Sequence, residues 1–395
     1  MSERSDMIKR RIKVVAIWLA VLLAILIAIF AYNIWYTTFD VRGLVFYDDS
    51  EIADIYMYEE RIYLVTVDGR AYVAGEYDET QSRTYRNSEF HKDNKLKTPA
   101  PVLIYNGEVR EIIPYSSLGA LIITADNELY NSYDMNMTKI SENVRRAYRD
   151  TSSDKTYVVD TDGKLFCLED AEFIYSGIVD TRVYQGRVFA LTSGGDLVEL
   201  SKSVDVAEYV IFDTLFTGVS SFEVIDTHIR HDGDRFVYDD KEGLASPLIT
   251  VLTDDGELYV KGAYNLMSCA TTLAEKQPEP KLFCDWEFID RYVESASTAP
   301  MGTVIRHYDG SCAYYGFELR VHRDSGFGYT ELPLTSTECV LASRISVCVK
   351  NEDGNYYFWG SFPYNFVHRY YDGGRDRKSH FVFSDVPLVW DISNG

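Results

Sequence analysis

The sequence has 395 residues, of which 46% are hydrophobic and 25% are charged. Asp and Glu together number 61 against 39 Lys and Arg, so the formal net charge is -22 at pH 7. A field of this sign repels phosphate backbones, which argues against nucleic acid as a partner, while the apolar content is sufficient for a large buried core.

The N-terminal region is predicted to anchor the chain in a membrane. Residues 1–13 contain five Lys and Arg side chains, and residues 14–36 contain no charge. A helix over the second segment would cover about 34 Å, enough to cross the hydrocarbon core of a lipid bilayer. The pattern predicts a basic cytoplasmic N-terminus at 1–13, a single transmembrane helix at 14–36, a juxtamembrane linker at 37–44 and an extracytoplasmic domain at 45–395. A cleaved signal peptide is the alternative, but its apolar region is usually about 7 to 15 residues long, and no A-x-A-like site follows here.

The rest of the chain repeats one β-hairpin pattern. In the clearest copy, Leu248 to Met267, two runs rich in apolar and β-branched residues flank Asp255-Gly256. Gly tolerates the positive φ of a tight turn and Asp can bond its own backbone, so this pair between two strand-like runs predicts a hairpin. Six further copies have the same form, at residues 62–75, 121–134, 157–167, 188–200, 304–316 and 347–360.

The spacing of these hairpins predicts the architecture. The seven turn residues are about 48 positions apart on average, which is typical of one propeller blade; they are Gly69, Asn127, Gly163, Gly195, Gly256, Gly310 and Gly354. A unit of this length holds about four short strands, and closure into a ring protects their edges. We therefore predict an all-β fold, a seven-bladed β-propeller preceded by one transmembrane helix. A second turn pair, Asp232-Gly233, is either an outer hairpin of the fifth blade or an extra unit, so eight or six blades are the alternatives.

The best copies share a longer motif, which reads EDGNYYFWG at 352–360, DDGELYVKG at 254–262 and VDGRAYVAG at 67–75. This motif resembles the repeat of the RCC1-like (regulator of chromosome condensation type) family of seven-bladed propellers, over roughly residues 45 to 390. The Trp-Gly pair of that repeat is complete only at Trp359-Gly360, and the second to fourth copies lack the closing Gly. The resemblance implies a binding function, since secreted or surface bacterial propellers similar to this family include inhibitors that bind another protein through blade loops.

All six cysteines follow the predicted membrane span, where disulfides are permitted. Cys339 and Cys348 are placed symmetrically about Ser343-Arg344, as partners across a hairpin would be, and Cys269 and Cys284 bracket one excursion after the fifth hairpin. These are the two candidate disulfides. The alternative is that several cysteines are small buried hydrophobic residues. No CxxC or Cys/His spacing indicates zinc.

Loop length is unevenly distributed around the predicted ring. The segment that follows each hairpin should leave every blade on the same face, and four of these segments are long and polar; they are residues 76–98, 263–281, 317–333 and 361–387. They belong to the first, fifth, sixth and seventh blades, which form one contiguous arc in a closed ring. Because binding residues concentrate on loops held by a rigid scaffold, this arc is the predicted binding face.

The last long segment contains a cationic and aromatic island in an acidic protein. Its candidate binding residues are Phe366, His368, Tyr370, Tyr371, Arg375 and Arg377. Tyr and Arg are enriched in interface hot spots, so we predict an extracellular or envelope protein as the partner. The simpler interpretation is that these polar residues are solvated or pair with acidic neighbours.

The sequence shows no catalytic constellation, no cofactor motif and no clear metal site. His228 and His231 could be drawn as a metal pair, and Asp160 to Gly163 resembles an incomplete fragment of a calcium loop, but a strand and a hairpin turn explain them more simply. We therefore expect a membrane-anchored binding module at a bacterial cell surface rather than an enzyme. Binding of cell-wall or capsular glycan within an envelope assembly is the alternative, and a hydrolase or lyase using the propeller channel is a third hypothesis.

Overall fold

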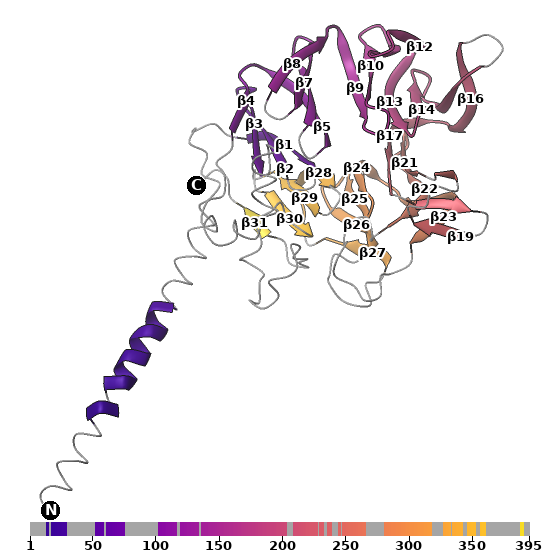
Figure 1. The fold of residues 1–395 in the computed structure, drawn as a ribbon. Coiled ribbons are helices and arrows are strands. Elements are labelled where there is room, and N and C mark those ends of the chain that lie inside the picture. The colour runs from indigo at the N-terminus through magenta and orange to yellow at the C-terminus, as the bar shows by residue number, and fades with distance from the viewer. Residues whose placement is uncertain are drawn as a thin grey trace, which may run out of the picture.

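The structure is a computed structural model. It describes residues 13–15, 17–29, 52–58, 61–75, 102–116, 119–133, 136–203, 208–227, 229–232, 235–238, 244–245, 247–265, 280–317, 327–332, 334–342, 346–352, 356–360 and 388–390. Residues 13–15 and 17–29 are helical, and this helix lies outside the ring of sheets (Figure 1). Within the described part of the chain, no helix has both the length and the apolar character needed to cross a membrane.

Seven four-stranded antiparallel sheets follow one another along the chain. Blades 1 to 4 each use four consecutive strands. These are β1 (Ile52–Tyr58), β2 (Arg61–Thr66), β3 (Ala71–Gly75) and β4 (Val102–Tyr105); β5 (Val109–Ser116), β6 (Gly119–Thr124), β7 (Leu129–Tyr133) and β8 (Asn136–Ser141); β9 (Val144–Asp150), β10 (Lys155–Asp160), β11 (Lys164–Cys167) and β12 (Glu172–Ser176); and β13 (Ile178–Tyr184), β14 (Arg187–Thr192), β15 (Leu197–Lys202) and β16 (Tyr209–Phe216).

Blade 5 differs because a small three-stranded sheet interrupts it. The blade consists of β17 (Val219–Ile225), β21 (Leu248–Thr253), β22 (Leu258–Tyr264) and β23 (Lys281–Asp290), and the inserted sheet of β18 (Ile229–Asp232), β19 (Arg235–Tyr238) and β20 (Leu244–Ala245). Blade 6 has β24 (Val293–Ala299), β25 (Gly302–His307), β26 (Cys312–Phe317) and β27 (Phe327–Glu331), and blade 7 has β28 (Thr337–Ala342), β29 (Ser346–Asn351), β30 (Tyr356–Gly360) and β31 (Leu388–Trp390).

The seven-bladed propeller is therefore confirmed. The first strands of neighbouring blades contact one another around the ring, from β1 through β5, β9, β13, β17, β24 and β28 back to β1, so these seven strands surround the axis. The turn at Asp232-Gly233 joins two strands of the insert and does not form an eighth blade.

Every predicted hairpin is the pair formed by the second and third strands of a blade. In the fifth blade, Gly256 N donates to Thr253 O and Thr253 N donates to Glu257 O, which leaves a three-residue loop. Its last residue, Gly256, has φ of 76°, and Asn127 holds the equivalent position of the second blade with φ of 62°. The turn motif predicted a residue with a left-handed backbone conformation at this position.

The same turn residue also joins each blade to the next. Its carbonyl accepts a hydrogen bond from the first residue of the following blade, as in Val109 N to Gly69 O (2.9 Å) and Val293 N to Gly256 O (2.9 Å). This inter-blade bond recurs at six junctions among the described residues. The edge of the ring that carries these turns, where the first strands begin, is called the turn face below, and the opposite edge, where the first strands end, the loop face.

The core lies between blades rather than within any one of them. The second strand of a blade is buried on both of its sides, because it is covered by the preceding and following sheets; β6 is buried at all six residues. Its sequence is consequently a continuous apolar run without alternation. One buried cluster combines Val159 and Leu165 of blade 3 with Val188 and Val198 of blade 4. Each such side chain contributes roughly 1.5–3 kcal/mol through burial.

The ring closes between blade 1 and blade 7 without a shared sheet among the described strands. Each of these blades is built from one end of the propeller sequence alone. β1 contacts β28, and Lys350 Nζ on β29 donates to Ala53 O on β1 at 3.1 Å. Lys350 also forms an ion pair with Glu338 at 3.1 Å. This junction is called the seam below.

The predicted cysteine pairs are treated differently by the structure. In the β28–β29 hairpin Cys348 lies opposite Leu341 and Cys339 lies opposite Lys350, so the prediction that the two cysteines face each other directly is wrong. A two-residue turn at Ser343-Arg344 would have paired them, but the connection is longer, because Ala342 pairs with Val347. Cys284 is an exposed thiol without a disulfide, and its predicted partner Cys269 lies outside the described residues.

Candidate binding site in the central channel

A cavity of about 390 Å³ lies on the axis, between the innermost strands. Its walls come from all seven blades, and Tyr58, Tyr115, Tyr148, Arg149, Arg182 and Glu223 are among the side chains that line it. These residues occupy the second halves of their strands, so the cavity lies toward the loop face.

Three polar groups of the cavity occupy equivalent positions in three adjacent blades. Tyr148, Arg182 and Glu223 are each the fifth residue of an innermost strand, in β9, β13 and β17 respectively. The inter-blade hydrogen bond fixes the first residue of each of these strands, and so aligns the three positions at one level of the axis. In the next blade, Ser297 is the fifth residue of β24 and lies at the same level. One sector of the channel, over blades 3 to 6, is therefore polar.

The carboxyl of Glu223 lies in an unusual environment. Burial raises its pKa to about 7, although the Arg182 guanidinium and the backbone N–H of Thr298 both act to lower it. Thr298 N donates to Glu223 Oε2 at 2.5 Å. Since a carboxylate can accept about four hydrogen bonds, Glu223 keeps acceptor capacity for a ligand.

Arg182 is held in place by contacts that use only part of its guanidinium. Nη1 donates to Asp180 Oδ1 (2.7 Å) and to Thr181 O (2.8 Å), and Cζ lies over the rings of Tyr148 (5.9 Å) and Phe222 (5.6 Å). Burial acts to lower the pKa of Arg182, but Asp180 and Glu223 outweigh it and raise the pKa above its usual value. The guanidinium is therefore charged at any physiological pH.

Tyr148 presents a hydroxyl with no hydrogen-bond partner within the described part of the chain. Burial raises the pKa of this phenol to about 12, so it is neutral and can both donate and accept. Its ring packs beside the buried cluster shared by blades 3 and 4.

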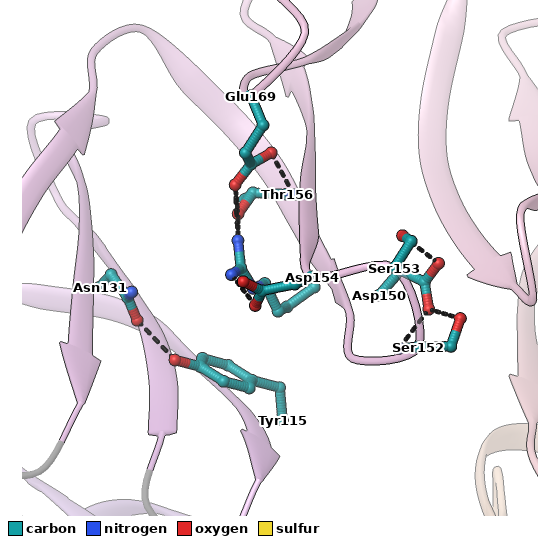
Figure 2. A network of polar contacts seen from close by, with 9 residues as sticks. Tyr115, Asn131, Asp150, Ser152, Ser153, Asp154, Thr156 and Glu169 are labelled. Carbon is teal, nitrogen blue, oxygen red and sulfur yellow. Dashed lines mark hydrogen bonds and ion pairs between the residues drawn. The ribbon is translucent and has the colours of Figure 1, made fainter.

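Arg149, the neighbour of Tyr148, forms structural contacts through Nη1 and Nη2. It donates to Thr156 Oγ1 and Glu169 Oε1, both at 2.5 Å, and it pairs with Asp154. Figure 2 shows Glu169, Thr156 and Asp154 gathered in one place, with Asp150 beside the adjoining turn. Arg149 therefore fixes the β9–β10 turn at the rim of the cavity.

A buried chain of hydroxyls supports the opposite wall. Tyr264 OH lies 2.7 Å from Thr303 Oγ1, which lies 3.0 Å from Thr298 Oγ1, which in turn lies 2.9 Å from Thr250 Oγ1. These residues come from blades 5 and 6. The chain orients Thr298, whose backbone N–H bonds Glu223, and thereby fixes the carboxyl at the axis.

The binding residues predicted from the sequence lie outside the described part of the chain. They are Phe366, His368, Tyr370, Tyr371, Arg375 and Arg377, and all six fall between β30 and β31. The long segments themselves are placed by topology: first and third strands of a blade run parallel, so the connections after β3, β22, β26 and β30 all leave from the loop face. The third segment is shorter than predicted, because β27 already begins at Phe327.

The minor candidate sites have simple structural explanations. Asp160 Oδ1 accepts from the backbone N–H groups of Asp162 (2.9 Å) and Lys164 (2.8 Å), so the interpretation as a hairpin turn is confirmed. His231 lies on strand β18, and His228 is outside the described residues. Among the side chains that the structure describes, no group of three or more His, Cys, Asp and Glu could hold a metal ion.

Tyr148, Arg182 and Glu223 were not predicted from the sequence. Innermost strands carry no turn motif, and the three residues are far apart along the chain. A usable signal existed nonetheless: alignment of the seven repeats by the first strand would have placed the three in one column, beside Tyr56, Ile113, Ser297 and Leu341.

No family model and no curated protein matches the chain. Among solved structures, it is similar to human WBSCR16 (10% identity, 87% of this chain and 82% of that chain covered, TM-score 0.42) and to Prp20p from Saccharomyces cerevisiae (11%, 86% and 77%, 0.42). It is also similar to PorZ, a surface component of the type-IX secretion system of Porphyromonas gingivalis (11%, 82% and 38%, 0.46). At these identities the likeness concerns the fold alone, and the propeller rests on the strand pairing described above.

Proposed function

We propose that this protein is a membrane-anchored module that binds a protein partner outside the cell membrane, through the loop face of its propeller. The observation that carries the proposal is the concentration of extra chain on one arc of that face. The connections β3–β4, β22–β23 and β30–β31 are long, whereas β7–β8, β11–β12 and β15–β16 are short.

The inserted sheet strengthens the same argument. It follows β17, and therefore leaves blade 5 at the loop face as well. Blades 5, 6, 7 and 1 are neighbours in the ring, so the extra segments share one contiguous arc. A rigid ring that presents variable segments on one side is suited to recognition, because the scaffold limits the entropy lost on binding.

Affinity capture tests the binding surface. Full-length protein would be compared with a variant in which Tyr370, Tyr371, Arg375 and Arg377 are replaced by Ala. The matched control replaces two Tyr and two Arg on the turn side, Tyr292, Tyr308, Arg145 and Arg291, all of which are exposed. We expect a partner to be captured by the wild type and the control but lost by the first variant, at equal thermal stability. Retention of the same partner by both variants would contradict the placement of the site.

The exposed thiol of Cys284 allows a test of location. Intact cells would be treated with a membrane-impermeant maleimide, with Cys284→Ser as the control for labelling at this position. An extracytoplasmic propeller predicts labelling without lysis, and the signal should fall in the variant. Labelling of Cys284 only after lysis would show that the propeller faces the cytoplasm, and would refute the proposed topology without bearing on the binding surface.

A further inference from the structure

The axial cavity has hydrogen-bonding capacity that the protein itself does not use. Nη1 of Arg182 has two acceptors, while its Nε and Nη2 donate to no acceptor among the described residues. Glu223 accepts from Thr298 and retains further lone pairs, and the Tyr148 hydroxyl has no partner in the described part of the chain. Donors and acceptors from three adjacent blades therefore converge on one space.

The cavity is lined by side chains of both signs, Arg149 and Arg182 on one hand and Glu223 and Asp226 on the other, which disfavours strongly charged ligands. An anion attracted by Arg182 would meet Glu223 and Asp226 in the same cavity, and a cation attracted by these carboxyls would meet Arg182. Arg182 already has its own counter-ion in Asp180. A ligand that matches the cavity is neutral overall and both donates and accepts hydrogen bonds, as hydroxyl groups do.

The size of the cavity and the residues of its walls restrict the class of ligand further. A volume of about 390 Å³ is at the lower end of the range of roughly 300–1,000 Å³ for small-molecule sites. Tyr115 and Tyr58 add aromatic side chains to the wall, and Pro114 and Pro300 add apolar surface. Aromatic and apolar wall residues beside hydrogen-bond donors and acceptors match a ring that has C–H groups on its faces and hydroxyls on its edge.

We propose that the axial cavity binds a sugar residue, with Tyr148, Arg182 and Glu223 as its hydrogen-bonding partners. The Tyr148 hydroxyl exchanges a hydrogen bond with one sugar hydroxyl, the remaining N–H groups of Arg182 donate to its neighbours, and Glu223 accepts from a third. This site is independent of the protein-binding arc, although both lie toward the loop face. The same chemistry is offered by a free saccharide and by the end of a glycan chain.

Saturation-transfer NMR tests the site with full-length protein in a detergent that has no sugar headgroup. The probes are glucose, galactose, rhamnose and N-acetylglucosamine, together with cellotetraose and chitotetraose, and with citrate and spermidine as charged probes. Tyr148→Phe removes only the unpartnered hydroxyl and leaves the ring beneath Arg182, so the fold should be unaffected. Tyr308→Phe, an exposed tyrosine near the turn face, is the matched control.

We expect at least one saccharide to give saturation transfer and to bind about five- to tenfold more weakly to Tyr148→Phe, with an unchanged melting temperature and with normal binding to Tyr308→Phe. Tighter binding of an oligomer than of its monomer identifies a chain end as the ligand, and the reverse identifies a free sugar. The proposal is overturned if no saccharide binds the wild type, if Tyr148→Phe binds as well as the wild type, or if citrate or spermidine displaces the sugar.

Discussion

One carboxyl group at the axis should make the stability of the protein depend on pH. The pKa of Glu223 lies near 7 in the folded protein and near its ordinary value of 4.5 in the unfolded chain. Between these values the folded protein retains a proton that the unfolded chain has released, so the free energy of unfolding falls as the pH rises, and the loss is complete above about 7. Burial without sufficient compensation is the cause.

Glu223→Gln should therefore stabilise the protein at pH 8 by on the order of 1–3 kcal/mol and change it much less at pH 5. Urea unfolding at both pH values measures the difference, with Glu331→Gln on the exposed end of β27 as the control. An equal effect of Glu223→Gln at the two pH values would show that the carboxyl is not the group responsible.

Two glycines with similar positive φ angles allow two costs of substitution to be distinguished: the strain of a left-handed turn residue and a steric clash between blades. Gly69 has φ of 87° and an added Cβ would lie 2.8 Å from Cα of Glu108, the residue directly before β5, whereas Gly186 has φ of 80° and open space around it. Both substitutions to Ala should cost about 1–2 kcal/mol for the left-handed conformation. Gly69→Ala should cost at least about 1 kcal/mol more, because the inter-blade bond from Val109 must also shift. Similar unfolding midpoints for the two variants would mean that the junction between blades 1 and 2 accommodates the added methyl group without cost.

At the scale of elements, the outer strands of blades 4 and 5 are connected by one side chain. Trp286 of β23 donates from Nε1 to Leu215 O on β16 at 3.1 Å, and its ring meets Phe216 edge to face at 4.9 Å. This contact protects part of an edge that exposes Phe212 and Val210.

Trp286→Phe keeps an aromatic ring and removes the indole N–H. The unbonded carbonyl of Leu215 should cost about 1 kcal/mol in the free energy of unfolding, and amide exchange should increase along β16 but not along β12 of the preceding blade. Unchanged exchange in β16 would indicate that the ring contact alone holds the two blades together.

The elements that the sequence predicted well were those defined by a local requirement. The second and third strands were found because an Asp-Gly or Asn turn must adopt a positive φ, which few residues do at low cost. First and fourth strands have no such signature. The prediction that Cys339 lies opposite Cys348 was wrong because the loop of this hairpin is longer than two residues, which shifts the register by two positions. The sequence did not show whether Asp232-Gly233 belongs to the fifth blade or to an extra unit, because one turn motif does not indicate which sheet its strands join.

At the scale of the whole molecule, Lys350 connects the two blades that meet at the seam. Lys350 supplies a hydrogen bond to Ala53 O and an ion pair with Glu338, and it acts to lower the pKa of Asp54, which burial raises. Lys350→Met should preserve the aliphatic packing while amide exchange increases in β1 and β28. Lys155→Met, which removes an ion pair within blade 3, is the control and should leave the seam unchanged. Equal protection of β1 in both variants would show that apolar contact alone closes the ring.

The turn motif did not reveal the channel site, because the site forms only after the ring closes. Tyr148, Arg182 and Glu223 come together when three blades are stacked at a level set by the inter-blade bond, and only alignment of the repeats by their first strands places them in one column. The seven-fold count and the side on which the long segments leave follow from chain order alone, and they were correctly predicted.

The seam also has a mechanical meaning. The proposed anchor enters the propeller at β1, and blade 1 shares no described strand with blade 7. Tension between a membrane and a partner held by the loop face would therefore enter the ring at the junction whose two blades are not consecutive in the chain. Under force, blade 1 should separate from blade 7 before any other two blades separate. The other six blades would then keep their structure.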